Sequence, residues 1–426
     1  MEIFDLLNKT FAKIDLSWID QTNDIRKSQI YSDLLLIFPN LENIFEKGWQ
    51  KDKEEFGRTL KHILRAFKIY FLIENNELSH DTLSSKSIEI IRNKITLQDQ
   101  KSKLIFILIL MYHDIGKLFD KYNHPHQSFL LIISDNLLDP FNLSDNDKLL
   151  VNKVIQYHLL FATIFTGEST FYGVYSLLND LEFIEILSNK NNVSRFLNLL
   201  EIFTIIDILG YPYTQIFDHY LKYYEEINFN LNEILNLWPD KEKALNTAKQ
   251  YSQKWLKWRI AGALRIFQFV ETKPYLTKEF YFYKLKESIK ESHNEFIYKM
   301  TWKLIKDKYL VHSYKIQMKY SLAFLMILAF GNFKRMGLKI NATISYKLLL
   351  FWTLLSKEVK TRSKESPDSL WNIFLEAMPH WSKIDQQFIN KINDKNIELL
   401  IRNSRHEFNV EKKEFSLYLD FKKVLE

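Results

Sequence analysis

A histidine and an aspartate stand side by side in the pentad His113-Asp114-Ile115-Gly116-Lys117, directly after an apolar run. The run, Leu104 to Met111, predicts a buried helix. A carboxylate held against an apolar element loses hydration, so it must find a cation or several hydrogen-bond donors. A divalent metal ion is such a cation. Adjacent helical residues point about 100° apart, but both can lean toward one point where the helix ends and Gly116 lets the chain turn. The pair therefore indicates metal chemistry.

The chain contains a second His-Asp dipeptide, His80-Asp81, which serves as an internal control. It follows the polar stretch Asn75 to Ser79, so we interpret it as part of a loop and helix cap. Only the pair at 113 and 114 is predicted to carry chemistry.

A metal site needs at least three protein ligands, so further ligands are expected on separate helices. Four candidates lie in or beside apolar, helical patterns: His62, His124, His158 and Asp207. A lone histidine on an apolar helix is more often a hydrogen-bonded core residue than a ligand. Asp207 differs, because one acid amid isoleucine and leucine needs a partner. His126 competes with His124 for one role.

In chain order, these residues resemble the HD superfamily of metal-dependent phosphohydrolases over roughly residues 55 to 215. Arg65, three residues after His62, adds to the resemblance, although we interpret it as a salt-bridge partner. So does the His-Pro-x-x-Ser pattern at 124–128, which favours His124 over His126. The resemblance implies an all-α helical core.

The resemblance also implies a role for each residue. The ligands of a first metal ion are His62, His113, Asp114 and Asp207. The ligands of a second ion are His124 and His158, with Asp114 bridging the two. Lys117 resembles the lysine that meets the substrate phosphate, so Asp114 and Lys117 are the expected catalytic residues.

The chemistry follows from this ligand set. One or two divalent ions (Mn, Fe, Mg, Zn or Ni) would lower the pKa of a bound water toward neutrality. The resulting hydroxide would attack a phosphorus whose oxygens contact the metal and Lys117. A cysteine nucleophile is excluded because the chain has no cysteine. The glycine-rich patterns that cradle phosphates in other folds are also absent.

Some features depart from the family. Many two-metal members have two consecutive histidines in the fourth segment, whereas Leu159 follows His158 here, so one ion or two stays open. No Gly-Tyr-Pro signature of the cyclic-dinucleotide branch accompanies the pentad. We interpret Gly210-Tyr211-Pro212 as a local coincidence after Asp207.

Composition predicts a mostly helical protein, because glycine and proline are scarce. The absence of cysteine fits a reducing compartment, and Met1 to Asp5 does not resemble a signal peptide, so we expect a cytoplasmic protein. The apolar runs Tyr320 to Phe330 and Leu348 to Leu355 fall short of the roughly 18 residues of a membrane span, so we expect buried helices there. The alternation in Glu414 to Phe421 predicts a lone strand or small hairpin.

Charge divides the chain into two unlike parts. Residues 241–426 carry 35 Lys and Arg against 19 Asp and Glu, whereas residues 1–240 carry 23 against 33. We place a boundary near Trp238-Pro239-Asp240, between an HD-type domain at 1–238 and a basic, mostly helical domain at 239–426. Basic residues alternate with tryptophans in Lys249 to Arg259, and more basic residues follow in Phe333 to Met336. This pattern suits nucleic acid, although an amphipathic helix that buries its tryptophans is the commoner meaning.

The expected function is metal-dependent hydrolysis of a phosphate ester or phosphodiester, with a nucleotide as the first choice of substrate. Nucleic acid is a further expected partner, through the basic half. A single-strand nuclease, a sensor or interaction protein that binds metal or nucleotide without turnover, and a di-iron oxygenase are the alternatives. Salt-sensitive oligonucleotide binding would favour the nuclease over a small-nucleotide enzyme.

Overall fold

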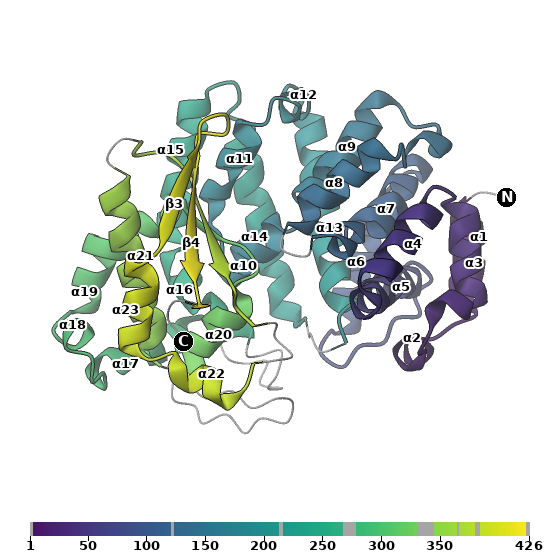
Figure 1. Ribbon diagram of the computed structural model, residues 1–426. Coiled ribbons are helices and arrows are strands. Elements are labelled where there is room, and N and C mark those ends of the chain that lie inside the picture. Colours follow the sequence, from purple (N-terminus) through teal and green to yellow (C-terminus); the bar gives the residue numbers. More distant parts are fainter. Residues whose placement is uncertain are drawn as a thin grey trace. The chain divides into compact units, whose positions relative to one another are not determined.

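Helices make up most of the chain (Figure 1). The structure is a computed structural model, and it describes residues 3–120, 123–212, 216–266, 278–330, 345–363, 366–379 and 384–422. The chain divides into two units: residues 1–161 with 189–228, and residues 162–188 with 229–426. Each unit is described by itself. The division into domains at 1–238 and 239–426 stays a prediction, although Asp240 does cap a helix, since its side chain accepts from the backbone N–H of Lys243.

The described residues of the first unit form helices and turns only. Its α-helices are α1 (Ile3–Ala12), α2 (Leu16–Gln21), α3 (Gln29–Ile37), α4 (Leu41–Lys51), α5 (Lys53–Glu74), α6 (Ser85–Thr96), α7 (Gln100–Tyr112), α8 (His124–Ser134), α9 (Asp145–Gln156) and α13 (Lys190–Leu209). Its 3-10 turns are η1 (Ile25–Lys27), η2 (Ile115–Leu118) and η3 (Asp139–Phe141). Helices α10 (Leu160–Thr166) and α14 (Asp218–Leu235) continue from this unit into the second.

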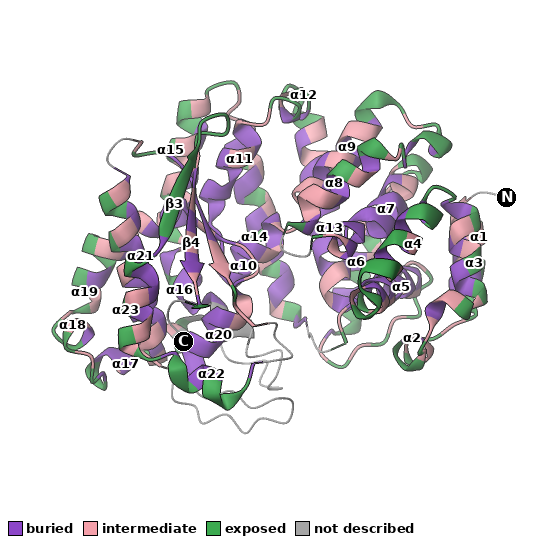
Figure 2. Ribbon diagram, viewed as in Figure 1, coloured by how far each residue is buried: buried purple, intermediate pink, exposed green. Residues whose placement is uncertain are grey.

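The central helices of the first unit are α5 and α7, which pack against each other. Helix α7 begins where the Asp99 side chain accepts from the backbone N–H of Ser102, and it is buried from Ile105 to Tyr112. Helix α5 is capped in the same way by Asp52 and buries most of its length (Figure 2). The buried helix predicted before the His113-Asp114 pair is confirmed, and it ends one residue before the pair.

The second unit combines helices with a small sheet. Its remaining α-helices are α11 (Val174–Leu178), α12 (Phe183–Leu187), α15 (Lys241–Lys254), α16 (Leu256–Ile266), α17 (Lys278–Lys290), α18 (Glu295–Tyr298), α19 (Trp302–Leu304), α20 (Leu322–Phe330), α21 (Lys347–Arg362), α22 (Gln386–Lys391) and α23 (Asp394–Arg402). Its other turns are η4 (Phe171–Gly173), the π-helical η6 (Ile305–Tyr309) and η7 (Leu310–Lys315). Its strands are β1 (Ile316–Met318), β2 (Trp371–Glu376), β3 (Arg405–Asn409) and β4 (Glu414–Asp420).

The sheet corrects the all-α prediction for the second half. Its strand order is β1-β2-β4-β3, with β1–β2 and β2–β4 parallel and β3–β4 antiparallel. The strand expected at the C-terminal end is present as β4, but it is neither alone nor confined to a hairpin, because β2 pairs with its other edge (Figure 1). The side chains of Phe415, Leu417 and Leu419 alternate into the core, as period-two alternation requires.

The apolar runs form buried helices, as predicted. The first run becomes α20, in which Phe324 to Phe330 are buried, and the second lies within α21. A different stretch, Asp145–Thr166, meets the length and hydropathy of a membrane span. About 61% of its apolar window is buried inside the structure, and a turn at residues 157–159 interrupts it. It is therefore best described as a core segment of α9 and α10.

Candidate metal centre

The six predicted ligands come from five places in the first unit, and the structure brings them together. His62 lies in the middle of α5, and Asp207 lies in the last turn of α13. His113 and Asp114 join α7 to η2. His124 is the first residue of α8, and His158 lies in the turn after α9. All six are buried or nearly so, and the least buried side chain, Asp207, is 13% exposed.

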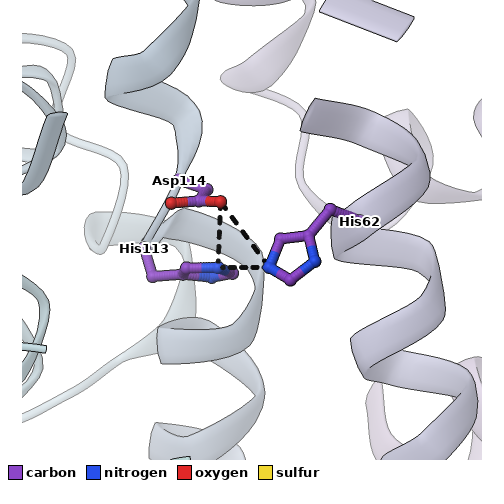
Figure 3. Close-up of side chains that lie close together, drawn as sticks. All are labelled: His62, His113 and Asp114. Carbon is purple, nitrogen blue, oxygen red and sulfur yellow. Dashed lines mark hydrogen bonds and ion pairs between the residues drawn. The ribbon is translucent and has the colours of Figure 1, made fainter. Parts of the chain in front are cut away.

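One group of side chains surrounds the Oδ2 atom of Asp114. The Nε2 atoms of His62 and His113 lie 3.6 and 3.4 Å from Oδ2, and 3.4 Å from each other (Figure 3). The Oδ1 atom of Asp207 lies 2.7 Å from Nε2 of His62 and 3.3 Å from Nε2 of His113. Two ligands of one ion, each about 2.1 Å from it, lie roughly 3 to 3.5 Å apart. This group therefore has the spacing of a metal-ligand set.

A second group surrounds the other oxygen of the same carboxylate. The Nε2 atoms of His124 and His158 lie 3.0 and 4.0 Å from Asp114 Oδ1, and 3.2 Å from each other. Asp114 thus presents one oxygen to each group, which is the arrangement of a bridging carboxylate. The structure places His124 in this group, whereas the half-buried His126 stacks on Phe129 outside it.

Backbone carbonyls fix the orientation of two imidazoles. Nδ1 of His113 lies 3.0 Å from the carbonyl oxygen of Leu110, and Nδ1 of His158 lies 2.7 Å from that of Ile155. When each Nδ1–H donates to its carbonyl, Nε2 keeps a lone pair that faces the site. Outer-shell partners of this kind are typical of histidine ligands to metal ions.

Two observations show that the buried groups fit a cation. Asp114 Oδ1 is buried and accepts no hydrogen bond among the described residues, although Nε2 of His124 lies close to it. The lone pairs on Nε2 of His62 and His113 would repel each other at 3.4 Å unless a proton or metal ion lay between them. A divalent cation would satisfy both the oxygen and the nitrogens.

The electrostatics of the site follow from burial and close charges. Burial alone would raise the pKa of Asp114, but the charges of Lys117 and His113 hold it well below its ordinary value. Hydrogen bonds from the imidazoles likewise lower the pKa of Asp207 against the effect of burial. Burial opposes charging of His113, but the two carboxylates together raise its pKa to about 9. Burial lowers the pKa of His158 to about 3. Both carboxylates and His158 are therefore already in their metal-binding protonation states at neutral pH.

Ser128 and Gly116 hold the turn that carries the His-Asp pair. The Ser128 hydroxyl accepts from the backbone N–H of Gly116 at 2.8 Å and donates to the carbonyl of His113 at 2.8 Å. A Cβ on Gly116 would lie 2.3 Å from the carbonyl oxygen of His124, so only glycine allows α8 to approach this closely. Ser128, the serine of the His-Pro-x-x-Ser pattern, thus holds the start of α8, with His124, against the turn that carries His113 and Asp114.

Lys117 and Tyr211 lie at one side of the first group. The Lys117 ammonium contacts Asp114 Oδ2 and lies 3.1 Å from the hydroxyl of Tyr211. The Tyr211 ring stacks on His62 with 3.9 Å between the ring centroids. The interpretation of Gly210-Tyr211-Pro212 as a local coincidence missed Tyr211, which lies just beyond the C-terminal end of α13; its closeness in sequence to Asp207 was the available signal.

Two other predictions concern residues outside the ligand groups. Arg65 is a salt-bridge partner, as interpreted: its Nη1 donates to both carboxylate oxygens of Asp20, at 2.8 and 2.7 Å. Its Nε donates to the carbonyl of Gly210, which holds the end of α13 beside α5. His80 lies in the loop just before a turn at residues 81–82, and its Nδ1 accepts from the backbone N–H of Thr82 at 3.3 Å. The control pair is therefore not part of the site.

No family model, curated protein or solved structure was found to match the chain. The structure itself shows a buried group of histidines and aspartates that could hold a metal ion.

Proposed function

We propose that this chain is a metal-dependent phosphohydrolase of the HD type, which cleaves a phosphate ester or phosphodiester in a nucleotide or nucleic acid. The observation that carries the proposal is the position of Asp114, whose two buried oxygens face two separate sets of imidazoles. The order of these residues along the chain supports the HD assignment. An isolated structural histidine would not require this convergence from five places.

The residues divide into two ligand sets. One set would hold a first ion: His62, His113, Asp207 and Oδ2 of Asp114. The other would hold a second ion: His124, His158 and Oδ1 of Asp114. When bound, a divalent ion supplies a water of lowered pKa and a Lewis acid for a phosphoryl oxygen. Manganese, iron, magnesium, zinc and nickel remain candidates for the ion, because nitrogen and oxygen ligands suit each of them.

Lys117 and Tyr211 provide the chain's own contribution to phosphate binding. The Lys117 side chain is about 20% exposed, so its ammonium can face an entering phosphoryl group while it contacts Asp114. Its charge would offset the negative charge that develops on the phosphoryl oxygens. The Tyr211 hydroxyl holds that ammonium in place, and its ring keeps His62 in one orientation.

The experiment measures hydrolysis of bis-p-nitrophenyl phosphate, nucleotides and short single strands in the presence of manganese. Wild type is compared with Asp114→Ala and with Asp81→Ala, which removes the carboxylate of the other His-Asp pair. We expect Asp114→Ala to lose at least about a thousandfold in rate, equivalent to about 4 kcal/mol of transition-state stabilisation. We expect Asp81→Ala to retain wild-type activity, because Asp81 is exposed in a turn.

Full activity in Asp114→Ala would contradict the proposal. A wild type that binds metal but turns over none of these substrates would indicate a sensor or interaction protein instead. Metal-dependent oxidation without hydrolysis would indicate a di-iron oxygenase.

A further inference from the structure

The second unit contains an open pocket between α15 and the turns η6 and η7. The pocket has a volume of about 540 Å³, which is within the range of ligand sites. Gln250, Gln253 and Lys254 line it from α15, and Lys306 and Asp307 line it from η6. Two ammonium groups and two amides thus face one concave surface, with a single carboxylate among these lining residues.

That carboxylate offsets one of the two lysine charges, so Lys254, Lys306 and Asp307 together give the lining a net charge of +1. Asp307 lies 3.8 Å from the ammonium of Lys306, and each side chain is 53% exposed. An exposed pair at this distance contributes little attraction. Lys254 is exposed and lies over the ring of Tyr251 at 5.1 Å. The pocket wall therefore keeps a net positive charge.

More basic groups lie on the elements that line the pocket, next in sequence to its lining residues. Lys249 precedes Gln250 on α15, and His312 follows Val311, another residue of the pocket lining, on η7. Both α15 and α21 pack against η7. Burial lowers the pKa of His312, and the positive charges of Lys360 on α21 and Lys249 on α15 lower it further.

Lys315, also on η7, completes the cluster. Burial, and then the charges of Lys360 and Lys315, lower the pKa of His312. Burial lowers the pKa of Lys315 to about 8, against the opposing charge of Asp368. Contacts within the unit hold two of these groups in place: the Lys315 ammonium donates to the carbonyl of Pro367 at 2.8 Å, and the Lys249 ammonium lies 5.2 Å from the centre of the Tyr314 ring.

A cleft lined by one sign of charge concentrates the field and attracts ligands of the opposite sign. The tryptophans between the lysines pack against side chains and backbone of their own unit, so the proposed contacts are to phosphates rather than to bases. Trp258 is 1% exposed and donates from Nε1 to the carbonyl of Phe165, and the Trp255 ring packs on Phe171. The ligand that fits these groups is one recognised by its chain of phosphates.

We propose that the pocket between α15 and η6, with the cluster of Lys249, His312, Lys315 and Lys360, binds the phosphate backbone of a single-stranded nucleic acid. Single strands are favoured over duplex because the phosphates of a duplex lie on a convex surface that cannot enter a pocket of this volume. The amides of Gln250 and Gln253 would hydrogen-bond to sugar or phosphate oxygens without reading sequence. This inference goes beyond the proposed hydrolysis and can hold or fail independently of it.

The test is fluorescence anisotropy of a labelled 15-nucleotide single strand with the full chain, titrated at several salt concentrations. EDTA is present throughout, so that metal-dependent cleavage cannot consume the probe. The variant Lys254→Ala/Lys306→Ala is compared with Lys395→Ala/Lys412→Ala, which removes two other exposed lysines that do not line the pocket. Thermal melting checks that both variants are folded.

We expect the pocket variant to bind at least about fivefold more weakly than wild type. Its plot of log affinity against log salt should be shallower by about 1.4, because each phosphate contact on a single strand contributes about 0.7. The control variant should match wild type, and duplex of the same sequence should bind more weakly. The proposal is overturned by undetectable binding to wild type at low salt, or by equal losses in the two variants. Equal competition by polyglutamate would also overturn it, in favour of an acidic protein partner.

Discussion

Two histidine-aspartate pairs lie in the first unit, in opposite surroundings. His113 and Asp114 are 0% and 1% exposed, and side chains from α5, α8, α13 and the turn after α9 converge on them. His80 and Asp81 lie where a loop enters a turn, and Asp81 is exposed to solvent. The dipeptide is the same, so the chemistry must come from the surroundings. Burial removes water from the carboxylate, and the imidazoles around it supply nitrogen atoms that could hold a metal ion beside it.

The largest expected difference between the two pairs is their effect on stability as pH changes. In metal-free protein the pKa of His113 is raised to about 9, so its stabilising contribution is complete below 6.5 and is lost as pH rises through 9. The shift corresponds to roughly 3 kcal/mol at most. Burial lowers the pKa of His80, so the stability that this group contributes depends on pH in the opposite direction: it is present above 6.5 and is lost as pH falls below 6.5.

Urea unfolding in EDTA at pH 6 and pH 9 measures this effect. We expect wild type and His80→Ala to lose stability at pH 9, and His113→Ala to show a much smaller loss. If all three proteins lost the same unfolding free energy between pH 6 and pH 9, His113 would not be the source of the pH dependence, and the two pairs would not differ in this way.

The next effect concerns the glycine that follows the buried pair. A Cβ at Gly116 would lie 2.3 Å from the His124 carbonyl and 2.5 Å from the Ser128 nitrogen, so Gly116→Ala must displace α8. We expect a loss of about 2 kcal/mol in unfolding free energy. Gly57 on α5 is the matched control, because a Cβ there meets nothing within 4 Å. Gly57→Ala should stabilise by about 0.5 to 1 kcal/mol. If Gly116→Ala and Gly57→Ala changed the unfolding free energy in the same direction, the close approach of α8 to the His113-Asp114 pair would be contradicted.

The smallest effect separates the hydroxyls beside the two pairs. Ser128 is fully buried and bonds to two backbone groups, so Ser128→Ala should cost about 1 to 2 kcal/mol and weaken metal binding. Thr82, beside His80, is half-buried and donates to the carbonyl of Ile216 at 2.6 Å. Thr82→Ala should cost less and leave metal affinity unchanged. Urea unfolding and metal titration of both variants measure these effects. Weaker metal binding in Thr82→Ala, or unchanged metal binding in Ser128→Ala, would contradict the prediction.

The candidate ligands could be found in the sequence because each is a polar residue in or beside an apolar, helical segment. Their convergence could not be derived from spacing, because His62 and Asp207 lie 145 positions apart and nothing local relates them. The order typical of a known family supplied that link. Tyr211 was missed because it lies after the end of α13, where no helical periodicity relates its side chain to Asp207 or His62.

The sheet of the second unit could not be predicted from local sequence patterns, for a different reason. Strand β1 is only three residues long, and the parallel partners β1, β2 and β4 are not consecutive hairpin neighbours, because helices lie between them in the chain. Only β4 shows the alternation that marks a strand, and it was predicted. In the stretch from Lys249 to Arg259, the amphipathic interpretation is correct for Trp258, which is buried, and for Lys257, which is exposed. The basic run from Phe333 to Met336 lies outside the described residues.

Metal analysis of the purified protein tests the central claim most directly. Wild type, Asp114→Ala and Asp81→Ala are each loaded with manganese or iron, desalted, and measured by elemental analysis. Because Asp114 offers one oxygen to each group, the account predicts one or two ions per chain in wild type and in Asp81→Ala, and none in Asp114→Ala. Equal metal content in all three proteins, or no metal in wild type, would contradict it.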